Sequence, residues 1–190
     1  MKYEMKFLVY FIKINHIYKL MTKVLKYLYK YRIALLFIFL FFVFVLLKDI
    51  FIIMLFIAVG ALSLIHMRFS QGFFGLELCT FFTVLGGIKY GAIAGAFIGV
   101  VSITLGLFIG GYIKQTIIIN MVGFFLIGII ASFFPMSKLF FAGVVLTVAY
   151  DAAAIPLFYF LGGNPVVVAS YGITHIILNI IIFSRGALFL

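Results

Sequence analysis

Residues 138–161 read KLFFAGVVLTVAYDAAAIPLFYFL, an apolar run interrupted near its middle by one carboxylate, Asp151. A membrane-spanning helix needs about 20 predominantly apolar residues, and this run is long enough to cross. An ionisable residue at membrane depth is costly and usually faces the interior of a helix bundle or an aqueous path. This stretch therefore predicts a helical membrane protein with a polar site between its helices.

The composition of the whole chain favours the same class of protein. Hydrophobic residues make up 67% of the chain and charged residues 9%, and the mean hydropathy is +1.39. A soluble domain typically has about 25% charged residues, so an ordinary soluble fold is excluded. A single cysteine, Cys79, excludes a disulfide framework and a thiolate zinc site. We expect no cofactor and no metal.

Turn residues and isolated charges divide the chain into seven apolar segments. We expect helices at 33–47, 50–67, 73–88, 90–112, 116–134, 138–161 and 166–184. The last four and 50–67 are long enough to span a bilayer, whereas 73–88 is short and suits a helix shielded by its neighbours. Segment 33–47 is intensely hydrophobic but only fifteen residues long. The predicted fold is all-α: a polytopic membrane bundle with a six-helix core and an additional N-terminal hydrophobic helix, giving six or seven crossings in one domain, 33–187.

The positive charge is concentrated at the N-terminus. Eight of the fourteen Lys and Arg residues fall within residues 1–32, and the formal net charge is +10. This asymmetry is the positive-inside pattern of a cell-membrane protein with a cytoplasmic N-terminus, and it is not a nucleic-acid-binding signature. Apolar residues recur among these lysines at helical spacing, which predicts a basic amphipathic helix on the membrane surface; a flexible basic leader is the alternative. Six crossings place twelve of the fourteen cations on one side, and seven crossings place ten.

Gly91, Gly95 and Gly99 repeat every four residues in segment 90–112. On one helix they would form a face without side chains, which predicts close packing against another helix. That helix could belong to the same chain or to a partner protein, and the sequence leaves both open.

Glu77 and Asp151 are isolated acids within apolar runs. Thr80 follows Glu77 by three residues, so we expect the two on one helical face; a carboxylate at a helix end that reaches interfacial water is the alternative. Pro156 follows Asp151 by five residues and is expected to free a backbone carbonyl beside it. For Asp151 the alternative is a structural pair with another helix.

Tyr171, His175 and Asn179 stand at i, i+4 and i+8 in the last segment and form one polar stripe. A pair between His175 and Asp151 across the preceding turn is sterically reasonable. It could hold a polar ligand, relay protons or only pin two helices together. The candidate ligand-binding residues are Glu77, Asn120, Tyr150, Asp151, His175 and Asn179.

The sequence contains no recognisable catalytic motif. A His-Glu-x-x-His pair, a Gly-x-Ser-x-Gly turn and a phosphate-binding loop are all absent. We therefore do not expect an enzyme.

Segment 72–187 resembles the substrate-binding S components of energy-coupling-factor vitamin and metal transporters. The likeness lies in FFGLEL at 73–78 leading into GIKYGAIAG at 87–95, in Tyr150-Asp151 followed by a Gly-Gly-Asn turn, and in HIILN at 175–179. The first two motifs also resemble the rod-shape-determining membrane subunit of bacterial cell-wall elongation, in which an acidic residue occupies the position matched by Glu77.

The first resemblance implies a small-molecule-binding subunit of a transporter. Its expected partners are the lipid bilayer, a small-molecule ligand, an energising membrane subunit and ATPases, since this chain has no nucleotide site. The alternative is a non-transporting membrane scaffold or assembly protein that uses its glycine-rich helix face to recruit other proteins.

Overall fold

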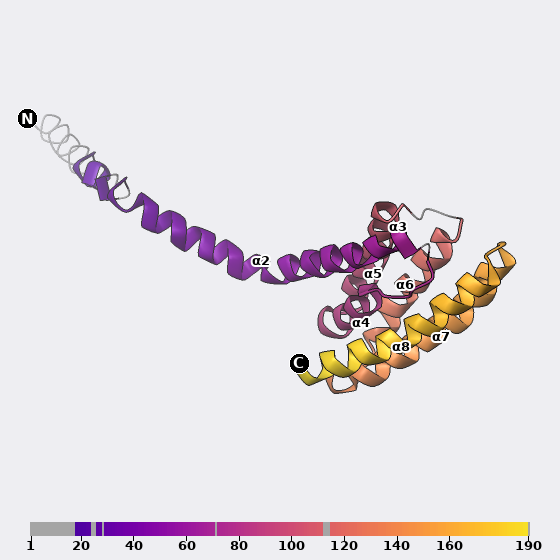
Figure 1. Cartoon of the computed structure of the whole chain (residues 1–190). Helices are drawn as coiled ribbons and strands as arrows, with labels where there is room; N and C mark the ends of the chain where they lie inside the picture. Colours follow the sequence, from indigo (N-terminus) through magenta and orange to yellow (C-terminus); the bar gives the residue numbers. More distant parts are fainter. Residues whose placement is uncertain (1–17, 24–25, 28, 71, 112–114, 190) are drawn as a thin grey trace, which may run out of the picture. The chain divides into compact units, whose positions relative to one another are not determined.

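The structure, a computed structural model, describes residues 18–23, 26–27, 29–70, 72–111 and 115–189, which form helices and their connections without any strand. The chain divides into two compact units, residues 1–49 and 50–190. Helix α2 (Arg32–Ser63) contains residues of both units (Figure 1). The all-α fold predicted from the sequence is confirmed.

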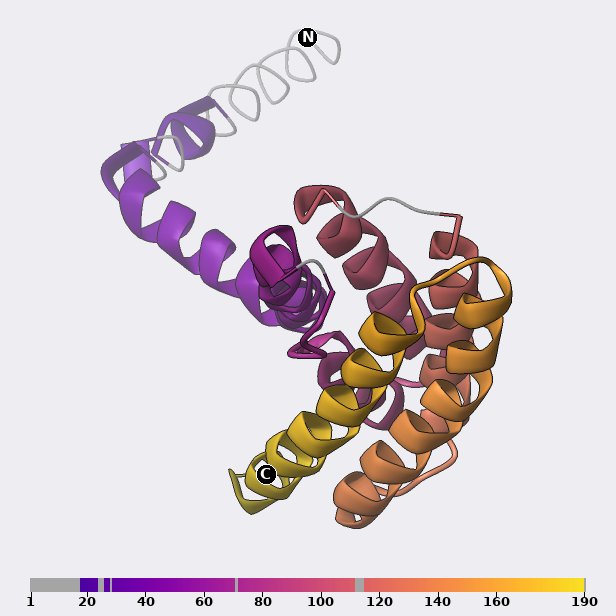
Figure 2. The ribbon, with the colours of Figure 1, turned by 45° about the vertical axis from the view of Figure 1, so that its right-hand side comes forward.

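The second unit is a bundle of helices (Figure 2). After α2 the chain forms η1 (Leu64–His66), α3 (Met67–Ser70), α4 (Cys79–Tyr90), α5 (Ala92–Ile109), α6 (Ile117–Ala131), η2 (Met136–Lys138), α7 (Leu139–Phe160) and α8 (Pro165–Phe189).

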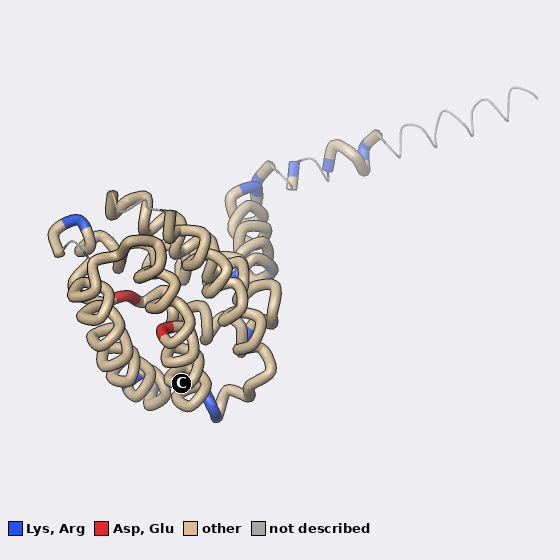
Figure 3. The backbone as a smooth tube through the Cα atoms, turned by 90° about the vertical axis from the view of Figure 1, so that its right-hand side faces the viewer, with Lys and Arg blue, Asp and Glu red and all other residues tan. Residues whose placement is uncertain are grey.

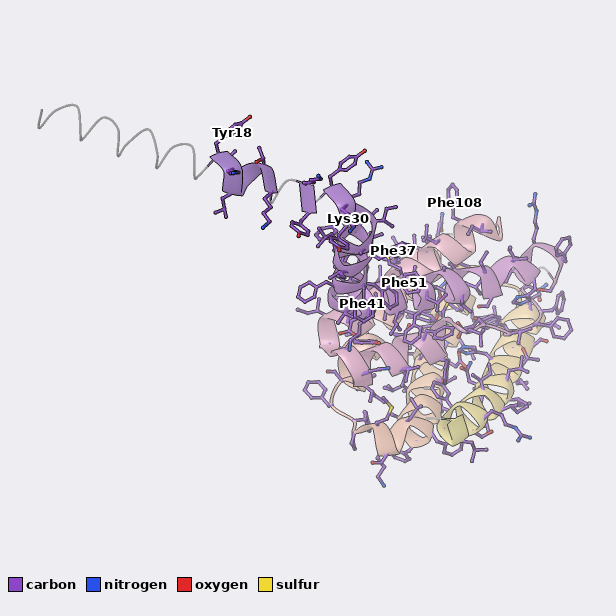
Figure 4. The ribbon with its side chains drawn as sticks, turned by 90° about the vertical axis from the view of Figure 1, so that its left-hand side faces the viewer. Tyr18, Lys30, Phe37, Phe41, Phe51 and Phe108 are labelled. Atoms are coloured by element: carbon purple, nitrogen blue, oxygen red, sulfur yellow. The ribbon has the colours of Figure 1, made fainter. Side chains whose placement is uncertain are left out.

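The break predicted at Lys48-Asp49 is wrong, because α2 stays helical through both residues. Neither residue removes a backbone hydrogen bond, and only Gly and Pro carry a large helix penalty. Residues 33–47 of α2 are all apolar. Phe37 and Phe41 are each 68% exposed, and their side chains project from the helix in Figure 4. A helix that is hydrophobic all round suits lipid. Residues 18–23 are helical, but most of the predicted amphipathic helix 1–32 lies outside the described residues.

Four helical stretches among the described residues are long and apolar enough to cross a membrane: Leu47–Ser70, Ala92–Ile109, Met136–Phe160 and Pro165–Leu188. Arg32–Val45 and Ile117–Ala131 are shorter apolar helices. These lengths and compositions define an all-helical integral membrane protein.

Helices α4, α5 and α6 pack backbone to backbone through glycines. A Cβ added to Gly95 would lie 2.5 Å from Gly87 Cα on α4 and 2.8 Å from Gly128 O on α6. A Cβ on Gly99 would lie 2.8 Å from Phe124 O. Since a side chain at these positions would collide with backbone, the glycine face is occupied within this chain.

Gly91 does not belong to that face, contrary to the prediction. It lies between α4 and α5 with a φ of 90°, and a Cβ there would meet nothing within 4 Å. A positive φ is easy for glycine and strained for other residues. Gly91 therefore makes the turn that lets α5 return along α4.

Helices α7 and α8 form an antiparallel hairpin. Gly143 near the start of α7 contacts Phe183 near the end of α8. Asn164 caps α8, because its Oδ1 accepts a hydrogen bond from Val166 N at 2.9 Å, and Pro165 takes the first helical position, where its missing N–H costs nothing. Helix α7 continues through Pro156.

The first part of the predicted helix 73–88 is not helical, and α4 begins only at Cys79. Side chains of two neighbouring elements satisfy its backbone. Thr174 Oγ1 accepts from Gly75 N at 2.8 Å, and Ser63 Oγ accepts from Leu78 N at 2.9 Å. Non-helical backbone at membrane depth is tolerated only where protein groups satisfy it in this way.

Three cations of the bundle lie at the same end. Lys89 is in the last turn of α4, Lys138 precedes α7, and Arg185 lies near the end of α8. A Cβ on Gly87 would lie 2.9 Å from Ala131 Cβ at the end of α6, which places the end of α4 beside the connection that leads to Lys138. Figure 3 marks the basic positions of the backbone in blue and the acidic positions in red.

Candidate functional site

A buried histidine joins the two isolated acids. His175 Nδ1 lies 2.8 Å from Asp151 Oδ2 and 2.9 Å from Oδ1, and its Nε2 lies 2.8 Å from Glu77 Oε1. The side chains of His175 and Glu77 are fully buried, and that of Asp151 is 2% exposed. We call these three residues the carboxylate–histidine triad. It links α7, α8 and the non-helical segment before α4.

The triad lies deep in the bundle. His175 is ten residues into α8, which at about 1.5 Å per residue places it about 15 Å from the helix start. The hydrocarbon core of a bilayer is about 30 Å thick, so this position is near its middle. The two carboxyl groups therefore bind the same histidine inside the protein and do not face lipid or interfacial water.

Glu77 precedes α4 and caps it, so the prediction that it shares a helical face with Thr80 is wrong. Its carboxylate accepts the backbone N–H of Thr80 at 3.0 Å and also the Thr80 hydroxyl. Free N–H groups and the helix dipole favour a negative charge at this end of a helix. The expected contact between Glu77 and Thr80 exists, but its geometry is that of a cap.

The geometry of the triad restricts its charge. Both imidazole nitrogens face carboxylate oxygens, and each contact needs one hydrogen because an ionised carboxylate only accepts. A protonated His175 between two carboxylates supplies both hydrogens. A neutral His175 with one protonated acid supplies both as well. Either arrangement leaves the triad with a net charge of about −1.

Two aromatic rings cover the histidine. Tyr171 stacks on His175 with ring centroids 5.4 Å apart and an interplanar angle of 21°. Tyr150 meets the same imidazole edge to face at 6.1 Å. The Tyr150 hydroxyl donates to Asn120 Oδ1 at 2.7 Å. The predicted residues Asn120 and Tyr150 are thus connected to the triad through one ring.

Asn179 lies one turn beyond the histidine. Its Nδ2 donates to His175 O at 3.0 Å, while its buried Oδ1 has no hydrogen-bond partner. The predicted stripe of Tyr171, His175 and Asn179 therefore shares one face of α8.

A cavity of about 420 Å³ lies beside the triad, at the end of the bundle where α6 and α8 begin. Of the predicted ligand-binding residues, only Asn120 lines it. The other five do not line the cavity: Glu77, Tyr150, Asp151, His175 and Asn179. The lining residues are Met67, Gly72, Ile103, Leu107, Thr116, Asn120, Phe158, Gly163, Asn164, Val167, Val168 and Tyr171.

Tyr171 separates the cavity from the triad, because it lines the cavity and also stacks on His175. Tyr171 belongs to the predicted polar stripe but was not among the predicted ligand-binding residues. Its spacing of four residues from His175 was the available signal. The lining residues from α5 and from the Gly163-Asn164 turn carried no such signal, since they come together only in the folded bundle.

No protein-family profile, no curated protein and no solved structure is detectably similar to this chain.

Proposed function

We propose that this chain is the small-molecule-binding subunit of a membrane transporter. The observation that carries the proposal is the cavity of about 420 Å³ at one end of the bundle. Small-molecule sites are typically concave, mostly apolar and about 300–1,000 Å³ in volume, with a few placed polar groups. The resemblance of segment 72–187 to S components supports the same function.

In this proposal the triad positions the site and does not itself touch the ligand. His175 holds the Tyr171 ring by stacking, and Tyr150 holds the Asn120 amide by a hydrogen bond. A ligand site needs its polar groups held by such a supporting layer, because small displacements weaken binding. The role is binding and not catalysis.

Transport requires partners that supply energy. The sequence has no phosphate-binding loop, so we propose that an energising membrane subunit and ATPases associate with the chain. The cations at the Lys89 end of the bundle favour that end as cytoplasmic, which puts the cavity at the other face of a cell membrane. A ligand would then enter from outside the cell.

The rival function, a non-transporting scaffold, was favoured by the glycine-rich face. Gly95 and Gly99 pack against α4 and α6 of the same chain. This glycine face therefore packs against helices of the same chain, and the glycine spacing is no longer evidence for a partner protein.

A matched pair of variants on α8 tests the proposal. Val168 lines the cavity, whereas Val166 is 68% exposed. We expect a small metabolite, detected by mass spectrometry, to co-purify with the wild-type protein and with Val166→Phe, but not with Val168→Phe, whose larger side chain takes up part of the cavity. The same metabolite bound at equal occupancy to Val168→Phe would contradict the proposal.

A further inference from the structure

The lining of the cavity specifies the charge of its ligand. Resting on the proposed function, we infer that the ligand is an uncharged, ring-containing molecule that presents a hydrogen-bond acceptor to Asn120. The inference rests on the hydrogen-bonding groups that line the cavity and on the lack of charged side chains among its described lining residues.

None of the lining residues that the structure describes carries a charged side chain. A charged ligand that leaves water needs a counter-charge or several hydrogen bonds to replace its hydration. Among these described lining residues, an anion would find no lysine or arginine, and a cation would find no carboxylate. The net negative charge of the triad lies behind the Tyr171 ring and further disfavours an anion.

Helix dipoles do not supply the missing charge. Helices α6 and α8 begin at this end of the bundle, whereas α5 and α7 end there. Their partial charges have opposite signs and offset one another. In addition, the first free N–H groups of α8 are directed to Asn164 Oδ1, which accepts from Val166 and Val167. A charged group in the cavity therefore gains little from the helix ends.

The amide of Asn120 determines the polarity of the hydrogen bond to the ligand. Its Oδ1 already accepts the Tyr150 hydroxyl at 2.7 Å. The Nδ2 group keeps two donors, so its complement on a ligand is an acceptor such as a carbonyl oxygen or a ring nitrogen. The Tyr171 and Phe158 side chains provide aromatic wall, against which a planar ring packs well.

Three probes of nearly identical shape test the charge: quinoline-2-carboxamide, quinoline-2-carboxylate and quinoline-2-carboxamidinium. Binding to the full chain in zwitterionic nanodiscs is measured by calorimetry, with naphthalene and indole analogues of each probe as a wider panel. We expect the neutral amides to bind at least tenfold more tightly than the acids and the amidiniums. Val166→Phe should bind like the wild type, and Val168→Phe should not bind.

Asn120→Leu tests the polar contact without filling the cavity. We expect this substitution to weaken binding of the amides by a factor at least five times larger than the factor for naphthalene itself, which has no acceptor. An acid or an amidinium that binds as tightly as its amide, and loses binding in Val168→Phe, would overturn the inference and leave the proposed function standing. If no probe of the panel shows binding that is lost in Val168→Phe, the result would contradict the proposed function instead.

Discussion

His175 Nε2 lies 2.8 Å from Oε1 of Glu77, a residue 98 positions earlier in the chain. The same imidazole binds Asp151 through its other nitrogen. One side chain of α8 therefore holds two acids, from α7 and from the non-helical segment before α4, and so connects three parts of the bundle at membrane depth.

Removal of the histidine should strongly destabilise the bundle. His175→Ala leaves two buried carboxyl groups without their shared partner, and breaking a buried charged network in this way costs about 3–5 kcal/mol. We expect a large drop in the melting temperature in detergent. Ser184→Ala, a change on the same helix at an exposed hydrogen bond, should leave it nearly unchanged. Equal melting temperatures for the two variants would show that the triad does not hold the fold together.

Loss of one hydroxyl should loosen the non-helical segment before α4. Thr174 Oγ1 accepts from Gly75 N, and Thr174→Val leaves this N–H unsatisfied at a cost of about 1–3 kcal/mol. We expect faster amide hydrogen exchange over residues 73–78.

Thr104→Val is the matched control for Thr174→Val, because the Thr104 hydroxyl bonds only to Val100 O within its own helix. Exchange over residues 73–78 should be unchanged in this control. The same acceleration in both variants would mean that the Thr174 bond has no specific role.

A single methyl group should disturb the contact between three helices. The Cβ of Gly95→Ala would lie 2.5 Å from Gly87 Cα, so backbone must move, and such overpacking costs about 1–3 kcal/mol. Ile93→Ala is the control on the same helix, because Ile93 is 88% exposed. Thermal unfolding in detergent distinguishes them; a Gly95→Ala protein as stable as Ile93→Ala would contradict the close packing of α4, α5 and α6.

The two ends of the bundle should lie on opposite sides of the membrane. Ser137 is exposed at the basic end, beside Lys138, and Leu161 is 50% exposed at the cavity end. The positive-inside bias favours a cytoplasmic location for the end with Lys89, Lys138 and Arg185. On the proposed orientation, a membrane-impermeant maleimide added to whole cells should label Leu161→Cys and not Ser137→Cys. The native Cys79 is fully buried and should stay unlabelled. The reverse pattern would invert the proposed orientation.

The apolar segments and their approximate bounds could be predicted from the sequence alone. Hydrophobicity and turn residues are local properties, so segments 116–134 and 138–161 closely match α6 and α7. Local rules failed at Lys48-Asp49, where charges were taken for a helix end, and at 73–77, where apolar residues were taken for a helix. In the second case side chains from distant helices satisfy the hydrogen bonds of a non-helical backbone, and such contacts leave no periodic signal in the sequence.

Sequence alone determined that Glu77, Asp151 and His175 lie in apolar surroundings and need partners, because burying an isolated charge is costly wherever the chain places it. Only the tertiary structure decided that these residues bind one another. The bundle brings together groups that are up to 98 residues apart. Of the residues predicted for the ligand site and the polar stripe, it places Asn120 and Tyr171 in the lining of the neighbouring cavity.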